Sequence, residues 1–112
     1  MKPTRGSEIY VGLMSGTSLD GVDVAIADFA PFPPKILHCQ SRPFPQPLRQ
    51  ALGELCQAHS ASLDSLYSVD AQLGEHYAAE VDFALKSASL EPCAIVAIGS
   101  HGQTIRHLSL IH

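Results

Sequence analysis

The sequence has few basic side chains. Seven Lys and Arg stand against eleven Asp and Glu, which gives the 112-residue chain a formal net charge of −4. The seven basic residues do not cluster, whereas proteins that bind nucleic acids usually present a basic face. The composition therefore argues against a nucleic-acid partner, and an apolar fraction of 46% indicates a globular chain.

The sequence also lacks a hydrophobic run near the roughly 20 residues that a membrane-spanning helix needs. Its first eight residues contain no apolar core of the signal-peptide kind. The three cysteines, Cys39, Cys56 and Cys93, are odd in number and widely spaced. We therefore expect a cytoplasmic protein without a membrane partner, whose reduced cysteines are buried as small apolar side chains.

Two common site patterns are missing. Gly16 and Gly21 have the spacing of a P-loop, but Val22 and Asp23 follow where that motif has Lys and then Ser or Thr. The lysine that would neutralise phosphate charge is therefore absent. The six histidines are scattered without zinc-ligand spacing, so no zinc site is expected.

What the sequence does contain is a loop of small and hydroxyl-bearing residues, Ser15-Gly16-Thr17-Ser18-Leu19-Asp20-Gly21. The apolar runs on either side, 9–14 and 22–29, are short and rich in β-branched residues, which predicts two strands. Turn amides and hydroxyl groups can cradle phosphate oxygens. A plain hairpin turn needs only two or three such residues, so this longer loop favours a phosphate site.

Two further strands are expected. One lies at 35–40, after a proline-rich turn at 31–34. The other lies at 94–98 and is apolar at every position. A run of this kind predicts a central, parallel strand that is covered on both faces.

Two amphipathic helices are expected between these strands. The first has Pro47 in its first turn and should end near His59. The second should begin after an N-cap at Ser62 and run to about Ser87. Its apolar residues recur at three- and four-residue spacing: Leu63, Leu66, Tyr67, Leu73, Tyr77, Val81, Ala84 and Leu85.

Two residues interrupt this apolar stripe. Gly74 lowers helix stability by about 1 kcal/mol relative to alanine, so we expect it to allow close packing against the sheet. Asp70 is expected to bond to a buried backbone group rather than to a ligand.

Two motifs carry a resemblance to a known family. Residues 12–23, Gly-Leu-Met-Ser-Gly-Thr-Ser-Leu-Asp-Gly-Val-Asp, are similar to the N-terminal signature of the anhydro-N-acetylmuramic acid kinases. Residues 98–107, Ile-Gly-Ser-His-Gly-Gln-Thr-Ile-Arg-His, resemble a second stretch of that family, in the same order. These enzymes belong to the sugar kinase, Hsp70 and actin superfamily, in which an N-terminal β-hairpin grips nucleotide phosphates.

The resemblance implies an α/β fold, a ribonuclease-H-like (actin-like ATPase) half-domain: an antiparallel three-strand meander, then helices, then a parallel strand. It also implies that residues 1–112 form the N-terminal part of a longer, two-lobed kinase. The chain has Leu108-Ser109 where the family usually has Arg-Pro. A non-catalytic nucleotide-binding fragment and an inactive truncated gene product are therefore the alternatives.

The family's reaction uses ATP and Mg²⁺. Water opens the 1,6-anhydro ring of anhydro-N-acetylmuramic acid while O6 takes the γ-phosphoryl group, which gives N-acetylmuramic acid 6-phosphate in peptidoglycan recycling. The resemblance thus implies a small amino-sugar substrate, and a homodimer is one arrangement open to a full-length relative. We find no general base in this segment, because in the family an aspartate outside it activates the water.

The resemblance also implies site residues. Those for the nucleotide are Gly16, Thr17, Ser18, Leu19, Asp20, Gly21, Val22 and Asp23. Asp20 could serve the magnesium shell or equally an Asx-type turn, and Asp23 should lie at the cleft edge. His101 and Gln103 could hydrogen-bond the sugar, or could satisfy only local backbone groups. Arg106 could meet a carboxylate or phosphate, or could be a solvated surface residue.

Overall fold

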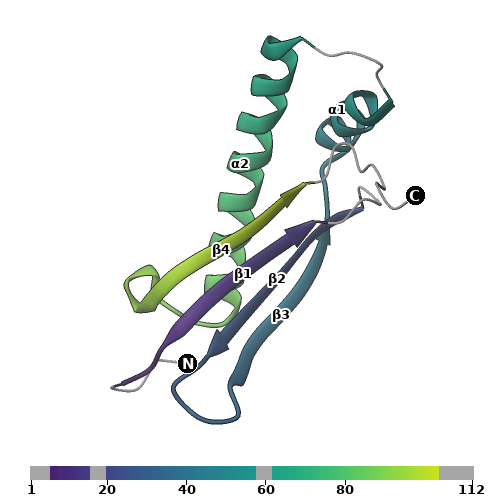
Figure 1. The fold of residues 1–112 in the computed structure, drawn as a ribbon. Helices are drawn as coiled ribbons and strands as arrows, with labels where there is room; N and C mark the ends of the chain where they lie inside the picture. Colours follow the sequence, from purple (N-terminus) through teal and green to yellow (C-terminus); the bar gives the residue numbers. More distant parts are fainter. Residues whose placement is uncertain (1–5, 16–19, 58–61, 104–112) are drawn as a thin grey trace, which may run out of the picture.

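In the computed structural model, which describes residues 6–15, 20–57 and 62–103, a four-stranded sheet is covered by helices on one face (Figure 1). The elements in chain order are β1 (Ile9–Ser15), β2 (Gly21–Asp28), β3 (Lys35–Pro43), α1 (Gln46–Gln57), α2 (Leu63–Ser87), a short 3₁₀ turn (Pro92–Ala94) and β4 (Ile95–Gln103).

The sheet has the strand order β3-β2-β1-β4. The first three strands form an antiparallel meander, and β4 runs parallel to β1. This mixed sheet with two helices confirms the predicted α/β class and is consistent with half of an actin-like ATPase fold. The third strand extends to Pro43, beyond the predicted 35–40.

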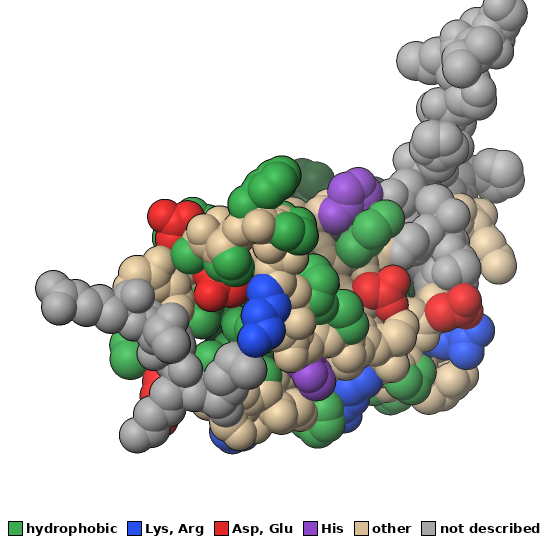
Figure 2. Space-filling view, turned by 90° about the horizontal axis from the view of Figure 1, so that it is seen from below, with side chains coloured by type: hydrophobic (Ala, Val, Ile, Leu, Met, Phe, Trp, Pro, Cys, Tyr) green, Lys and Arg blue, Asp and Glu red, His purple; other side chains and the backbone are tan. Residues whose placement is uncertain are grey.

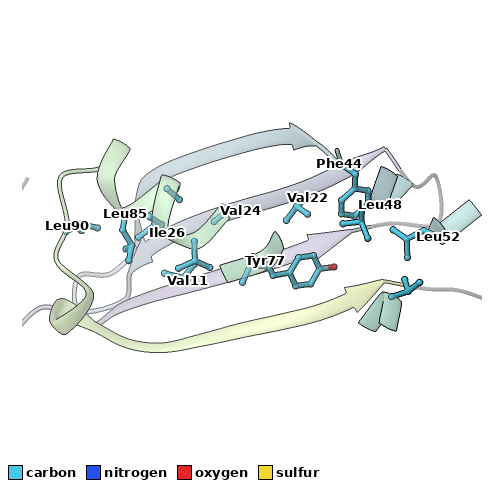
Figure 3. Close-up of a cluster of buried hydrophobic side chains, with 14 of the residues drawn as sticks. Val11, Val22, Val24, Ile26, Phe44, Leu48, Leu52, Tyr77, Leu85 and Leu90 are labelled. Carbon is cyan, nitrogen blue, oxygen red and sulfur yellow. The ribbon is translucent and has the colours of Figure 1, made fainter. Parts of the chain in front are cut away.

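The core lies between the sheet and the helices. Along β1, buried and exposed residues alternate without exception, as expected for a strand with one covered face. Val11, Val22 and Ile26 point from the sheet toward Tyr77 and Leu85 of α2 (Figure 3). Each fully buried aliphatic side chain contributes roughly 1.5–3 kcal/mol, so this layer holds α2 on the sheet.

The prediction that the last strand is central and covered on both faces is wrong. β4 is an edge strand of the described sheet, and its Val96 and Ile98 are 57% and 53% exposed. The physical reason is the position of α2, which packs over β2 and β3. An apolar run in the sequence predicts a strand, but it does not show which elements cover that strand.

The boundaries of α2 follow the prediction closely. Ser62 is the N-cap, and its hydroxyl accepts a hydrogen bond of 3.1 Å from the Ser65 amide. The predicted apolar stripe is buried only in its second half. Leu63 and Tyr67 are each 66% exposed, because the first turns of α2 extend past the edge of the sheet (Figure 1).

The explanation predicted for Gly74 is also wrong. A side chain added there would meet nothing within 4 Å, so the glycine allows no close packing against the sheet. Asp70 is exposed and lines a cavity with Gly74 and Tyr77. Among the described residues it forms no hydrogen bond with a buried backbone group, which corrects that expectation too.

The cysteines are not the buried side chains that were expected. Cys39 lies on the open face of the sheet and is exposed, Cys93 is exposed in the 3₁₀ turn, and Cys56 is half-buried. On the face shown in Figure 2 the basic side chains lie apart, separated by other residues. No helix in the described ranges is long and apolar enough to span a membrane.

Candidate functional site

The two sequence motifs meet at one edge of the sheet. β1 ends at Ser15 and β2 begins at Gly21, so the loop between them leaves the sheet there. Because β4 is parallel to β1, the two strands end at the same edge of the sheet, with Gln103 paired to Ser15. The end of β3 and α1 lie at this edge as well (Figure 1). In α/β sheets, ligands commonly bind at such carboxyl ends of parallel strands.

Several predicted site residues lie outside the described part of the chain. These are Gly16, Thr17, Ser18, Leu19 and Arg106. For Gln103 the structure gives the backbone alone. The roles assigned to these residues therefore stay predictions.

Gly21 is placed where a side chain has no room. A Cβ atom there would lie 2.1 Å from the backbone oxygen of Arg42 in β3. The neighbouring backbone is also tied across the two strands, since the Phe44 amide donates a hydrogen bond of 3.2 Å to the carbonyl oxygen of Asp20. The glycine thus permits the close approach of β2 and β3 at this edge.

Val22, the next residue, points away from the edge. Its side chain is 0% exposed and belongs to the core beneath α2. Any contact of Val22 with a nucleotide would therefore use its main chain.

Asp20 is paired with a residue that the sequence did not single out. Its Oδ1 lies 3.6 Å from a guanidinium nitrogen of Arg49 in α1, and both side chains are exposed, by 75% and 53%. Arg49 follows Asp20 by many residues, so no local pattern in the sequence indicates the pair. The pairing brings positive charge to the base of the predicted phosphate loop.

Asp23 lies on the face of the sheet that no described helix covers, on the other side from the core. Its carboxylate accepts a hydrogen bond from the hydroxyl of Ser41 on β3. Both residues line a cavity of about 290 Å³, together with Met14, Asp20 and Gly21. Asp23 is exposed at the sheet edge, and its place at the edge of a cleft stays a prediction.

A second cavity, of about 410 Å³, lies between the helices and the end of β4. Leucines from α1 and α2 line it, and Tyr77, Ser100 and His101 supply polar groups. The Tyr77 hydroxyl is hydrogen-bonded to that of the buried Ser15. Burial raises the pKa of Tyr77, and the bond with Ser15 opposes that rise. The sequence identified Tyr77 only as a core residue.

His101 is exposed near the end of β4 and lines both this cavity and one on the open face of the sheet. Its position beside the β1 end brings the second motif to the first. The structure thus gathers Asp20, Gly21, Asp23 and His101 at one edge, with Arg49 as an addition.

Comparison with known proteins identifies the family. A family model described as anhydro-N-acetylmuramic acid kinase matches residues 8–111, which is nearly the whole chain. The chain belongs to the anhydro-N-acetylmuramic acid kinase family. Both motifs at the sheet edge lie within the matched range, which confirms the resemblance derived from them.

Individual members of the anhydro-N-acetylmuramic acid kinase family agree. The protein of that name from Pasteurella multocida (strain Pm70) is 43% identical over 98 residues, which cover 88% of this chain and 26% of the relative. The namesake from Hahella chejuensis (strain KCTC 2396) is 45% identical over 108 residues, covering 96% of this chain and 29% of the relative. The chain therefore spans between a quarter and a third of the length of these relatives.

Proposed function

We propose that this chain is the nucleotide-binding N-terminal part of an ATP-dependent anhydro-N-acetylmuramic acid kinase. In this proposal the loop 16–19 and the start of β2 hold the phosphates of ATP. The reaction is the hydrolytic opening of the 1,6-anhydro ring with phosphorylation of O6, a step of peptidoglycan recycling. Residues 1–112 alone would lack activity, since the general base lies elsewhere in the family.

The observation that carries the proposal is the convergence of two separate motifs at one sheet edge. The hairpin loop leaves β1 at Ser15, and the second motif runs through the end of β4, whose Gln103 is paired with Ser15. Phosphoryl transfer depends mainly on alignment and charge stabilisation, so a nucleotide and a sugar must lie close together. Loops that leave the ends of two adjacent parallel strands, here β1 and β4, can hold two ligands close together.

For the sugar, we propose a place beside His101. This side chain is exposed and lines both cavities at the β4 end. Its imidazole can donate or accept a hydrogen bond, which suits a hydroxyl-rich ligand. Gln103 is proposed to act with it, as the sequence predicts.

The described residues fit an indirect role for Mg²⁺. They contain no group of three or more His, Cys, Asp or Glu side chains suited to a metal ion. In nucleotide sites Mg²⁺ usually keeps several waters and binds phosphates with one or two carboxylates. We propose that Asp23 and Asp20 meet those waters; Asp23 is hydrogen-bonded by Ser41, and both carboxylates line the same cavity.

A chimaera tests the proposal. This chain would replace the matching segment of the Hahella chejuensis relative, and ATP-dependent phosphorylation of anhydro-N-acetylmuramic acid would be measured. We expect activity that falls by about 100-fold or more in the Gly16→Val variant, because the side chain blocks the phosphate cradle. The Thr17→Ala variant should raise the KM for ATP.

The matched control is Ser87→Ala, which removes a hydroxyl from the exposed far end of α2. It should leave both kinetic constants unchanged. If a folded chimaera is inactive and the 112-residue chain also binds no ATP, the proposal is wrong. Unchanged activity in Gly16→Val would remove the phosphate role of the loop while leaving the kinase assignment intact.

A further inference from the structure

The predicted phosphate loop contains no positive charge. Residues 15–21 carry hydroxyls, glycines and one aspartate, and Asp23 adds a second acid nearby. Two carboxylates beside a polyphosphate repel it, by roughly 4 kcal/mol for each pair of unit charges 4 Å apart at an effective dielectric of about 20. Besides the proposed Mg²⁺, a nucleotide at this edge would be stabilised by a positive charge from another part of the chain.

Arg49 is in the position to supply it. α1 begins directly after β3 reaches the sheet edge, and Arg49 lies in its first turns. Its guanidinium reaches to 3.6 Å from Asp20, near the end of that loop. A guanidinium has five N–H donors in a fork that matches phosphate oxygens. The contact with Asp20 joins one guanidinium nitrogen to one carboxylate oxygen.

The other described cations are committed elsewhere. Arg42 packs its guanidinium 3.7 Å from the centre of the Phe83 ring and faces the buried Glu80. Lys86 pairs with Asp82 at the far end of α2, and Lys35 opens β3 at the opposite end of the sheet. Arg42 is the strand partner of Val22 and lines the cavity at Asp23, but its guanidinium is held by these two contacts. Within the described ranges, Arg49 is thus the basic side chain whose guanidinium lies near Asp20, at the start of β2.

The pair with Asp20 leaves Arg49 available to a phosphate. Both partners are more than half exposed, and exposed ion pairs contribute only about 0–1 kcal/mol. A phosphate offers more charge and better geometry for a guanidinium than a carboxylate 3.6 Å away. Sharing Arg49 between Asp20 and a phosphate also neutralises the acid that would repel the nucleotide.

From these contacts we propose that Arg49 is a nucleotide-binding residue, which contacts the phosphates of ATP and takes the place of the P-loop lysine. This inference rests on the proposed function. It goes beyond the motifs, because Arg49 lies in neither of them.

The test is titration of the 112-residue chain with ATP, ADP and adenosine by calorimetry, together with the KM for ATP in the chimaera. Arg49→Gln should weaken ATP binding by about 10- to 100-fold, ADP binding less, and adenosine binding not at all. Arg49→Lys should recover part of the loss. Lys86→Gln, which removes the same charge far from the loop, is the control. It should bind ATP, ADP and adenosine with the affinities of the unaltered chain.

Asp20→Asn separates a phosphate contact from a merely structural ion pair. This titration is made without Mg²⁺, so that the proposed magnesium role of Asp20 does not affect it. If Arg49 meets the phosphates, the variant releases the guanidinium and removes a repulsive charge, so ATP binding is kept or tightened. If Arg49 acts only by holding Asp20, Asp20→Asn should weaken ATP binding as much as Arg49→Gln does, and the inference is wrong. Equal losses for ATP and adenosine would also overturn it.

The proposed function and this inference fail in different ways. Absence of ATP binding and activity in the unaltered proteins overturns the proposed function, and the inference with it. Normal ATP binding in Arg49→Gln overturns the inference alone. Circular dichroism of each variant shows that a loss of binding does not come from unfolding.

Discussion

The side-chain hydroxyls of Ser15 and Tyr77 are hydrogen-bonded to each other in the buried layer between β1 and α2. Ser15 is 1% exposed and is the last residue of β1 before the predicted phosphate loop. Tyr77 lies in the half of α2 that packs on the sheet. The bond therefore links the base of that loop to the helix layer.

Replacing Tyr77 with phenylalanine tests this link. The ring stays in the core while the hydroxyl is lost, so we expect the free energy of unfolding to fall by about 1 kcal/mol. Urea denaturation followed by circular dichroism measures it. Tyr67→Phe is the control, because Tyr67 is 66% exposed on the same helix. Equal effects of the two substitutions would show that the buried bond contributes nothing to stability.

Gly21→Ala should destabilise the chain by about 1–3 kcal/mol or more, because the new Cβ meets backbone atoms of β3 that cannot turn away. Thermal unfolding measures the loss. Gly12→Ala is the matched control in β1, where an added Cβ meets nothing within 4 Å, and it should be tolerated. A stable Gly21→Ala variant would contradict the close approach of the two strands.

Gly74→Ala should stabilise the chain. The residue is helical and has open space around its missing side chain, so alanine gains about 1 kcal/mol of helix propensity without a clash. The expected result is a higher denaturant midpoint with an unchanged slope. A lower midpoint would mean that the glycine has a packing partner after all.

Acid stability should depend on Asp28. Hydrogen bonds of 3.0 Å from the Ala30 and Glu8 amides lower the pKa of its carboxyl in the folded chain. A lowered folded-state pKa adds stability above the unfolded-state pKa of about 4, and that stability is lost as the pH falls further.

Asp28→Asn keeps an acceptor oxygen but does not titrate. Carboxyl groups titrate at about pH 3 to 6. Over that range the unfolding free energy of the variant should therefore change less than that of the unaltered chain. Denaturation at a series of pH values measures the two slopes. Parallel slopes would show that these amide contacts do not favour the charged carboxylate.

Local patterns in the sequence predicted most of the fold. The short, β-branched runs of β1 and β2, the N-cap Ser62 and the proline near the start of α1 are all local features, and the structure confirms the elements that they predicted. The covering of the elements could not be predicted in the same way. Val96 and Ile98 are exposed because α2 packs over other strands. That packing depends on the tertiary structure, which a local sequence pattern does not show.

The site shows the same division. Its motifs were visible in the sequence because their residues are consecutive, and parallel pairing of β4 with β1 then brings them together. Arg49 and Tyr77 were not assigned to the site, because their contacts with Asp20 and Ser15 join residues far apart in the chain. A lone arginine or a tyrosine in a helix carries no local sign of such a partner.

The close contact between Gly21 and the Arg42 backbone oxygen affects how the family signature is interpreted. This glycine is required by the spacing of two strands, whatever is bound beyond them. A descendant of this fold that had lost its nucleotide would still need glycine at this position to fold. Catalytic competence in such a descendant would have to be judged from the hydroxyl residues of the loop and from Arg49.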